Sequence, residues 1–488
     1  MNISTTENYR PAYHFSPQKG WMNDPNGMVY FEGEYHLFYQ HYPQGTTWGP
    51  MHWGHAISRD LVTWEEQPVA LAPDEHGMIF SGSAVVDWKD TSGLFGGKPG
   101  LVAIFTHHDV IPGTDQARQR QSLAYSTDSG RTWTKYAGNP VLADEKYPDF
   151  RDPKVFWHEP SEQWVMILAC GQTVCLYNSP NLKDWTFVSE FGQGIGYHDG
   201  VWECPDLFPL AVDGEPSRTK WVMLVSIGNE DGIREGSRTQ YFTGEFDGRT
   251  FTADEDSAEI RWLDQGRDNY AGVCWSDIPH EDGRRLFIGW MSNWRYANIT
   301  PLENWRGAMT LVRELALETR VGKVTLVQRP IRELKQFLSP VVSLHQASVR
   351  EAQAALSGLQ LESYVISAEI EAKEEWGFKV RSSAEQMTLV GYDPELGGLY
   401  VDRTRSGQSK FHEDFAGRHI AKVDPVNGRL DILIYVDRSS VEVFAGGGQA
   451  VITDLVFPDA EAQGLGLFAA DDSLKLHTLE VSTLSFRS

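Results

Sequence analysis

The chain has 488 residues, and its 43 basic and 67 acidic side chains give a formal net charge of −24. This negative balance argues against nucleic acid or an anionic membrane surface as a partner. No stretch approaches the ~18 apolar residues of a membrane-spanning helix, and the first residues have neither the basic nor the apolar segment of a signal peptide. We therefore expect a cytoplasmic protein, or a secreted one if a leader has been trimmed from the chain.

The sequence predicts no metal site and no disulfide framework. Its four cysteines, Cys170, Cys175, Cys204 and Cys274, have no Cys-x-x-Cys spacing, and no histidine pairs stand at zinc-ligand intervals. The cluster at residues 107–109, two histidines and an aspartate, does not change this, because adjacent residues of a strand point to opposite faces. No cofactor is expected.

A loose repeat of Ser, a turn and then Trp organises the first two-thirds of the chain. It occupies residues 58–64, 126–133 and 179–185, with a weaker copy at 244–251, and each copy is expected to be a hairpin turn. The copies start roughly 50 to 70 residues apart, which is typical of propeller blades. Short runs rich in aromatic and β-branched residues surround them, at 29–31, 35–39, 101–105, 164–168, 221–225 and 286–290. The fold class is therefore expected to be all-β, with a β-propeller first.

The pattern changes near residue 330. A short connector with helical character comes first, followed by alternating strands at 377–381, 399–403, 430–437 and 440–444. Alternation with a period of two between polar turns indicates a β-sandwich. We expect a catalytic propeller over residues 1–332, a linker over 333–344 and a sandwich over 345–488. No ligand is assigned to the sandwich.

Three short acidic motifs carry the chemistry. They lie at residues 21–27, 151–153 and 202–206, and each places a carboxylate, Asp24, Asp152 or Glu203, close to a proline. Alone, each is an ordinary turn or a solvated ion pair, because proline and glycine favour turns and short motifs often match by chance. Together they indicate a carboxylate active site built on loops.

Two carboxyl groups that face a sugar are the minimal apparatus of glycoside hydrolysis. Asp24, next to Asn23 and amides of its turn, is expected to stay ionised, which suits a nucleophile. Glu203, between apolar neighbours, is expected to be desolvated, which suits a proton donor. Asp152, paired with Arg151, is expected to stay charged and to hold sugar hydroxyls.

These motifs resemble glycoside hydrolase family 32, the β-fructosidases that include invertases, exo-inulinases, levanases and sucrose-6-phosphate hydrolases. Further motifs occur in the family's order at residues 36–40, 53–56, 80–83 and 289–294, and more weakly at 401–407 and 439–444 of the expected sandwich. The resemblance implies a five-bladed propeller joined to a β-sandwich, and a retaining double displacement at C2 of a terminal β-fructofuranosyl unit. It makes Asp24 the nucleophile, Glu203 the acid/base and Asp152 the transition-state stabiliser, without a metal or organic cofactor. The residues it implies for the fructose pocket are Asn23, Gln40, Trp48, Phe80, Ser81, Arg151, Tyr270 and Trp294.

Within the family, residues 122–141, 200–208 and 268–273 are similar to levanases and exo-inulinases. An exo-acting enzyme is therefore expected, with sucrose, fructo-oligosaccharides, inulin or levan as the substrate. Three alternatives stay open: a sucrose-6-phosphate hydrolase, a relative that transfers fructose to another sugar, and a fructan-binding protein without catalysis.

Overall fold

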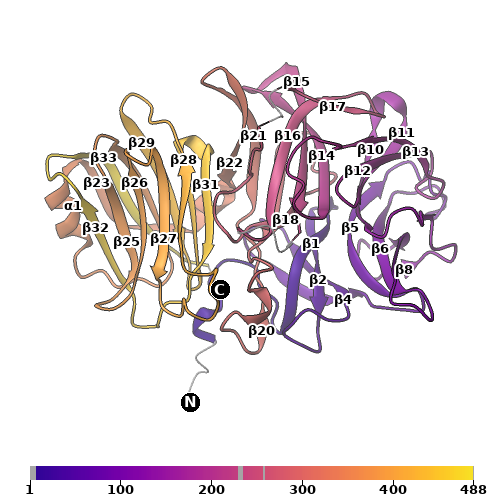
Figure 1. The fold of residues 1–488 in the computed structure, drawn as a ribbon, viewed down its shortest axis with the longest axis horizontal. Coiled ribbons are helices and arrows are strands. Elements are labelled where there is room, and N and C mark those ends of the chain that lie inside the picture. The colour runs from indigo at the N-terminus through magenta and orange to yellow at the C-terminus, as the bar shows by residue number, and fades with distance from the viewer. Residues whose placement is uncertain (1–6, 229–234, 256–258, 487–488) are drawn as a thin grey trace.

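The computed structural model describes residues 7–228, 235–255 and 259–486, and almost all of its regular structure is β-strand. Two bodies stand side by side (Figure 1), a propeller formed by the N-terminal part of the chain and a sandwich formed by the C-terminal part. No helix in the described ranges is long and apolar enough to cross a membrane.

The propeller has five blades within the described residues, and each is an antiparallel unit of four main strands. The first blade also gains a parallel pairing with β20 (Trp305–Arg306). The strands of the first three blades are β1 (Gly20–Phe31), β2 (Glu34–Tyr42), β3 (His52–Ser58) and β4 (Glu65–Leu71), then β5 (Met78–Asp87), β6 (Gly100–Val110), β7 (Ala117–Ser126) and β8 (Thr134–Lys135) with β9 (Leu142–Ala143), then β10 (Phe150–His158), β11 (Gln163–Cys170), β12 (Val174–Ser179) and β13 (Thr186–Phe191). The last two blades share one sheet and contain β14 (Trp202–Val212), β15 (Glu215–Ile227), β16 (Arg238–Phe246) and β17 (Phe251–Ala253), then β18 (Tyr270–Cys274), β19 (Arg285–Trp290), β21 (Arg313–Arg320) and β22 (Lys323–Pro330).

The Ser-turn-Trp repeat marks the same place in successive blades. Each copy connects the third strand of a blade to the fourth, as β3 to β4, β7 to β8, β12 to β13 and, for the weaker copy, β16 to β17. The serine hydroxyl accepts a backbone N–H of its own turn, for example from Leu61 to Ser58 at 2.7 Å and from Gly130 to Ser126 at 2.9 Å. Side-chain bonds of this kind stabilise tight turns, so the hairpin expected from the sequence is confirmed.

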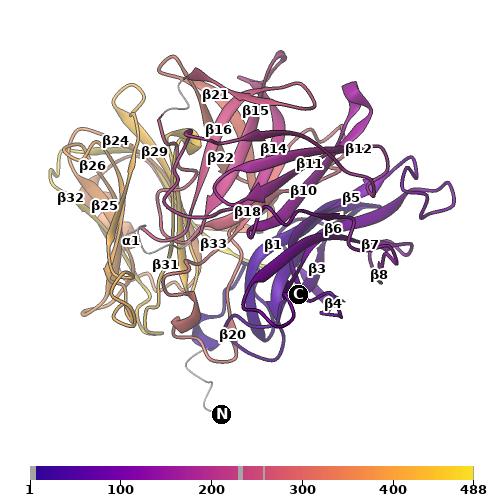
Figure 2. The same cartoon turned by 45° about the vertical axis from the view of Figure 1, so that its right-hand side comes forward.

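The first strand of every blade faces the centre of the propeller. Strands β1, β5, β10, β14 and β18 contact one another in a closed ring, with β18 returning to β1. The turned view in Figure 2 also shows these first strands gathered at the middle of the blades. The ring brings residues from five distant parts of the sequence to one central channel.

The sandwich consists of two antiparallel sheets. One has the order β23-β33-β24-β29-β30-β31 and the other β28-β27-β26-β25-β32, with apolar side chains of both sheets forming one core. The strands are β23 (Leu338–Ser348), β24 (Tyr364–Glu371), β25 (Trp376–Ser382), β26 (Met387–Asp393), β27 (Gly398–Arg405), β28 (Arg418–Lys422), β29 (Arg429–Val436), β30 (Ser440–Ala445), β31 (Ala450–Leu455), β32 (Gly464–Ala469) and β33 (Lys475–Leu484), and α1 (Val349–Leu356) follows β23.

The connector between the two bodies is shorter than the 333–344 expected from the sequence. A 3-10 helix spans Arg332–Phe337, and β23 begins at Leu338 and pairs with β33 along its length. The strand is hard to recognise in the sequence because most of its side chains are exposed and a proline stands at its third position. The first residues of the sandwich therefore lie within the expected linker.

Buried ion pairs join the bodies. Arg313 of β21 contacts Glu442 of β30 at 2.6 Å, and His14 contacts the same carboxylate at 2.8 Å. Arg403 of β27 contacts Asp268, two residues before β18, at 2.6 Å. These pairs attach the sandwich to the propeller next to the ring of first strands.

Candidate active site

All five first strands carry an irregularity at the same level, close to where they begin. The pairing register of each shifts within its first residues: at Met22/Pro25, Ile79/Gly82, Arg151/Lys154, Glu203/Asp206 and Tyr270/Val273. A β-bulge of this kind bends a strand and re-aims its side chains. The acidic motifs therefore lie inside strands, and the expectation that they form loops is wrong. Proline is tolerated there because a bulge leaves a backbone N–H without a ladder partner.

The bulges share a three-residue pattern that the sequence analysis did not identify. In each strand the third residue is Pro or Gly, and in three strands the middle residue has a left-handed backbone: φ is 64° at Asp152, 45° at Cys204 and 54° at Ala271. Such conformations in non-glycine residues cost about 1–3 kcal/mol each and often mark functional sites. The five copies are residues 23–25, 80–82, 151–153, 203–205 and 270–272.

Asp24 is held by two side-chain donors from neighbouring blades. The Asn23 amide donates to one carboxylate oxygen at 3.1 Å, and the Ser81 hydroxyl of β5 donates to the other at 2.8 Å. These donors favour the ionised form, but burial and the nearby charge of Glu203 outweigh them and raise the pKa of Asp24 to about 6. The sequence predicted that backbone amides of a turn would donate to Asp24, whereas in the structure the Ser81 hydroxyl donates to it. The carboxylate is thus fixed in direction and remains mostly ionised at neutral pH.

Asp152 lies deeper, with 6% of its side chain exposed. Its carboxylate accepts the backbone N–H of Cys204 at 3.0 Å, and the Cys204 sulfur is 3.6 Å from Asp152 and 3.5 Å from Asp24. Burial, together with the charges of Glu203 and Asp24, raises the pKa of Asp152 although Arg151 opposes the shift. The closest approach of Arg151 to Asp152 is 3.9 Å, so the tight pair expected from the sequence is not formed.

Arg151 pairs with Glu203 instead. Its Nη2 donates to Glu203 Oε1 at 2.9 Å, and the Tyr270 hydroxyl of β18 donates to the other oxygen. Glu203 is the more exposed partner, with 21% of its side chain accessible against 12% for Arg151. The carboxyl of Glu203 is therefore accessible from solvent.

The other residues expected for the fructose pocket surround these carboxylates. Gln40 of β2 is buried and donates to the carbonyl of Ile79 at 3.0 Å, next to Phe80. The ring of Phe80 lies edge-on to Trp48 at a centroid distance of 6.2 Å, and the Trp48 side chain is 41% exposed. The structure therefore brings Gln40, Phe80 and Trp48 to one side of the site.

Trp294 lies on the other side. It stacks on Trp21 at a centroid distance of 5.9 Å, and the Trp21 indole donates to Asn23 at 2.7 Å. Trp294 is thus linked to Asp24 through Trp21 and Asn23.

Four residues of the site were missed by the sequence analysis. Cys204 lies between Asp24 and Asp152, and burial and those carboxylates raise the pKa of its thiol, which keeps it neutral. Asp149 and Gln119 both accept from Arg151 and fix its guanidinium. Thr106 accepts the backbone N–H of Asp152 at 3.1 Å. Only Cys204 had a sequence signal, since it stands between Glu203 and Pro205.

The arrangement suits acid–base and nucleophilic chemistry on a glycosidic bond. Three carboxyl groups converge, with Asp152 buried, Asp24 and Glu203 half-buried, and Arg151 as the cation among them. In the described ranges, no group of three His, Cys, Asp or Glu side chains is arranged to hold a metal ion. A cluster of carboxyl groups that can supply both a nucleophile and a proton donor is the apparatus that glycoside hydrolases use.

Comparisons with known proteins agree with this class. Residues 14–330 match the family model of the glycosyl hydrolases family 32 N-terminal domain, and residues 333–483 match the family 32 C-terminal model. The chain therefore belongs to glycosyl hydrolase family 32.

Its relatives and structural neighbours are enzymes of this family. The chain is 52% identical to a levanase of Bacillus subtilis (strain 168) over 98% of its own length and 71% of that protein. The crystal structure of an exo-inulinase from Aspergillus awamori superposes with a TM-score of 0.88 at 38% identity, covering 98% of both chains. A β-fructofuranosidase from Schwanniomyces occidentalis complexed with fructosyl-erythritol superposes with a TM-score of 0.89 at 31% identity, covering 100% of this chain and 99% of the other.

Proposed function

We propose that this protein is a retaining exo-β-fructosidase that removes terminal β-D-fructofuranosyl units from fructans, fructo-oligosaccharides and sucrose. The observation that carries the proposal is the convergence of Asp24, Asp152 and Glu203 on three bulged strands around one channel. The levanase and exo-inulinase relatives support the choice of substrate.

We assign the roles from the geometry of the site. Asp24, held by Asn23 and Ser81, attacks C2 of the fructosyl unit and forms a covalent bond to it. Glu203, whose carboxyl is partly exposed, gives its proton to the departing oxygen as the C2–O bond breaks. It then takes a proton from the water that attacks C2 and releases Asp24.

Asp152 and Arg151 complete the reaction. The transition state carries positive charge on the sugar ring, and the buried carboxylate of Asp152 stabilises that charge because it is fixed before the reaction begins. Arg151 holds Glu203 in position through two hydrogen bonds, at 2.9 and 3.3 Å. The raised pKa of Asp24, about 6, means that this nucleophile becomes ionised and able to attack only as the pH rises through that value.

Product analysis tests the proposal. Sucrose, inulin, levan and sucrose-6-phosphate are supplied at equal fructosyl concentration, with Asp24→Asn as the control. We expect fructose from the unphosphorylated substrates and none from the variant. Activity confined to the phosphorylated sugar would make the protein a sucrose-6-phosphate hydrolase, and longer oligosaccharides among the products would make it a transferase. Absence of any product would overturn the catalytic assignment.

A further inference from the structure

A second cavity opens at the other end of the same five strands. The catalytic residues stand near the beginning of each first strand, whereas the end of β5, β10 and β14 and the residues after β18 line a cavity of about 650 Å³. Phe156 is four residues beyond Asp152, and Phe208 is five beyond Glu203. Lys154, two residues beyond Asp152, also lines the cavity, so at about 3.3 Å per residue the cavity extends from about 7 to 17 Å beyond the carboxylates. We name it the rear cavity.

The rear cavity does not continue into the active site. Between them lie the residues that follow each catalytic side chain, including Pro25, Pro153 and Pro205, and the space they leave is only about 10 Å³. That is room for about one water molecule. A ligand in the rear cavity therefore occupies a site separate from the catalytic one.

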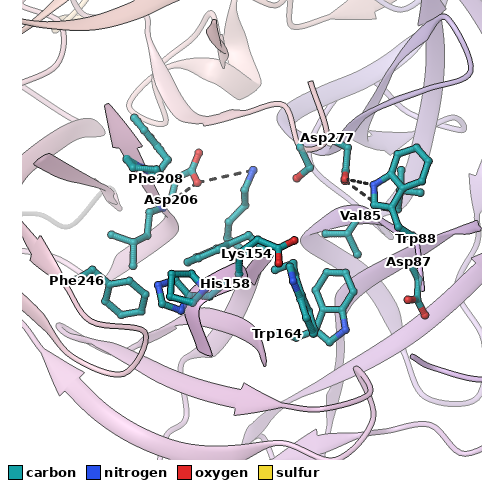
Figure 3. Close-up of a pocket in the computed structure, with 18 of the residues that line it drawn as sticks. Val85, Asp87, Trp88, Lys154, His158, Trp164, Asp206, Phe208, Phe246 and Asp277 are labelled. Atoms are coloured by element: carbon teal, nitrogen blue, oxygen red, sulfur yellow. Dashed lines mark hydrogen bonds and ion pairs between the residues drawn. The ribbon is translucent and has the colours of Figure 1, made fainter. Parts of the chain in front are cut away.

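Aromatic side chains form much of the wall. In Figure 3, Phe208 and Phe246 stand on one side of the cavity, Trp164 at its base and Trp88 at the opposite rim. The Trp88 side chain is 57% exposed, although it belongs to the same propeller whose other large aromatics are mostly buried. Aromatic walls in a cavity of about 300–1,000 Å³ are typical of small-molecule sites.

The polar side chains at the rear cavity include both hydrogen-bond donors and acceptors. The Lys154 amine lies between the carboxylates of Asp206 and Asp277 (Figure 3). It donates to the carbonyl of Cys274, and its distance to Asp206 is 3.8 Å, too long for a hydrogen bond. Asp277 accepts from the backbone of Val86 at 2.9 Å and from the Trp88 indole at 2.8 Å, one donor per oxygen. Both the amine and the carboxylate therefore keep capacity for a further partner.

The charges at this cavity nearly balance. Three cations line the cavity, Lys89, Lys154 and Arg285, together with four carboxylates, Asp87, Glu159, Asp206 and Asp277. This small net charge gives neither an anion nor a cation a strong preference. A neutral ligand with many hydroxyls fits better, because a hydroxyl can accept from Lys154 and donate to Asp277, and the C–H face of a sugar ring complements the negative face of an aromatic ring.

We propose that the rear cavity is a second carbohydrate site, which binds a neutral oligosaccharide between its aromatic wall and the Lys154 and Asp277 side chains. This site takes no part in bond cleavage. Its role is binding alone, on the face of the propeller opposite the catalytic carboxylates.

Calorimetric titration with kestotriose, the trisaccharide of sucrose and one further fructose, tests the proposal. Asp24→Asn protein is used so that the sugar is not consumed, and we expect two sites per chain. Adding Trp88→Ala removes an exposed aromatic wall and the donor that orients Asp277, so we expect the second site to weaken at least about tenfold and the first to stay unchanged. Adding Phe187→Ala instead, which removes another exposed aromatic (51%) at β13, should leave both sites unchanged.

Three outcomes would overturn the proposal: one site per chain, a second site indifferent to Trp88→Ala, or a cavity that binds the aromatic cation benzamidine in place of the trisaccharide. The result is independent of catalysis, because Trp88→Ala in the otherwise wild-type protein is expected to release fructose from sucrose at the normal rate. A crystal soaked with kestotriose locates the second site directly.

Discussion

Buried carboxylates occur in two regions of this protein, and their protonation differs. At the interface with the sandwich, burial alone would raise the pKa of Glu442, but Arg313 and His14 outweigh it and lower the pKa to about 2. In the central channel, burial and the charge of Glu203 raise the pKa of Asp24 to about 6. Burial raises the pKa of both carboxyl groups, so their partners decide the direction of the net shift.

The difference lies in how many cations serve each group. Glu442 accepts from both Arg313 and His14 at 2.6 and 2.8 Å. In the channel, Arg151 is shared among Asp149, Asp152 and Glu203, and Asp24 has only neutral donors. Incomplete pairing costs stability but keeps a carboxylate available to react. The interface is thus built for stability and the channel for chemistry.

The largest expected effect comes from unpairing the interface. Glu442→Gln removes the carboxylate that Arg313 and His14 share, while each keeps one other carboxylate, Asp264 at 3.1 Å and Asp437 at 2.8 Å, so the free energy of unfolding should fall by about 3 kcal/mol, the low end for breaking a buried pair. Urea denaturation at neutral pH measures this loss, and the activity of the folded fraction should not change. Glu362→Gln is the matched control, because Glu362 pairs with Arg438 at 3.2 Å on the surface and such pairs contribute about 0–1 kcal/mol. Equal effects of the two variants would contradict the comparison.

Removing a carboxyl group of the channel should reduce activity without preventing folding, the reverse of the interface variant. Asp24→Asn and Glu203→Gln are each expected to fold normally and to lose at least about 10²-fold in turnover, the lower range for acid–base catalysis. Initial rates of fructose release from sucrose measure the loss. Near-normal rates in either variant would defeat the roles proposed for these residues.

Much of this fold was predictable from the sequence. The Ser-turn-Trp repeat predicted the blades, and the alternating strands after residue 377 predicted the sandwich, because both patterns are local and follow directly from side-chain direction in a strand. The family resemblance supplied the five-bladed count and the candidate residues. Their placement around one channel agrees with that expectation, while their catalytic roles stay proposals.

The features that were not predictable depend on distant partners. The sequence predicted turns at Pro25, Pro153 and Pro205. It could not reveal the bulges that accommodate these prolines in strands, because a bulge is defined only by the pairing of two strands. The protonation of Asp24 depends on Glu203 and Ser81, which come from other blades. The rear cavity had no sequence signal, because Phe156, Phe208 and Asp277 are ordinary strand-end residues until the ring closes.

A smaller change should adjust the channel without destroying it. Ser81→Ala removes a hydroxyl that donates to Asp24 and favours its charged form, so the pKa of Asp24 should rise above about 6. The proposed nucleophile must be ionised, hence activity is lost as the pH falls through this value. We expect the acid limb of kcat/KM for sucrose to move up by about one pH unit, as a charged hydrogen bond of about 1.5 kcal/mol implies.

The control is Ser129→Ala, which removes a surface hydroxyl bonded to Glu32. An acid limb that shifts downward, or shifts equally in the control, would show that Ser81 does not stabilise the charge on Asp24.

The smallest effect concerns the stability of the channel itself. Because the pKa of Asp24 is raised from its ordinary value of 3.8 to about 6 in the folded protein, the folded state binds more protons than the unfolded state between these values. Asp24 therefore lowers stability as the pH rises through this window. Asp24→Asn, which cannot ionise, should raise the free energy of unfolding at pH 7 by on the order of 1 kcal/mol relative to the wild type. This gain in the free energy of unfolding should disappear at pH 4, where the Asp24 carboxyl of the folded wild type is protonated. Melting temperatures of both proteins between pH 4 and pH 7 test this prediction. If the stability of the variant relative to the wild type falls as the pH rises, the donors around Asp24 fully offset the cost of burying its charge.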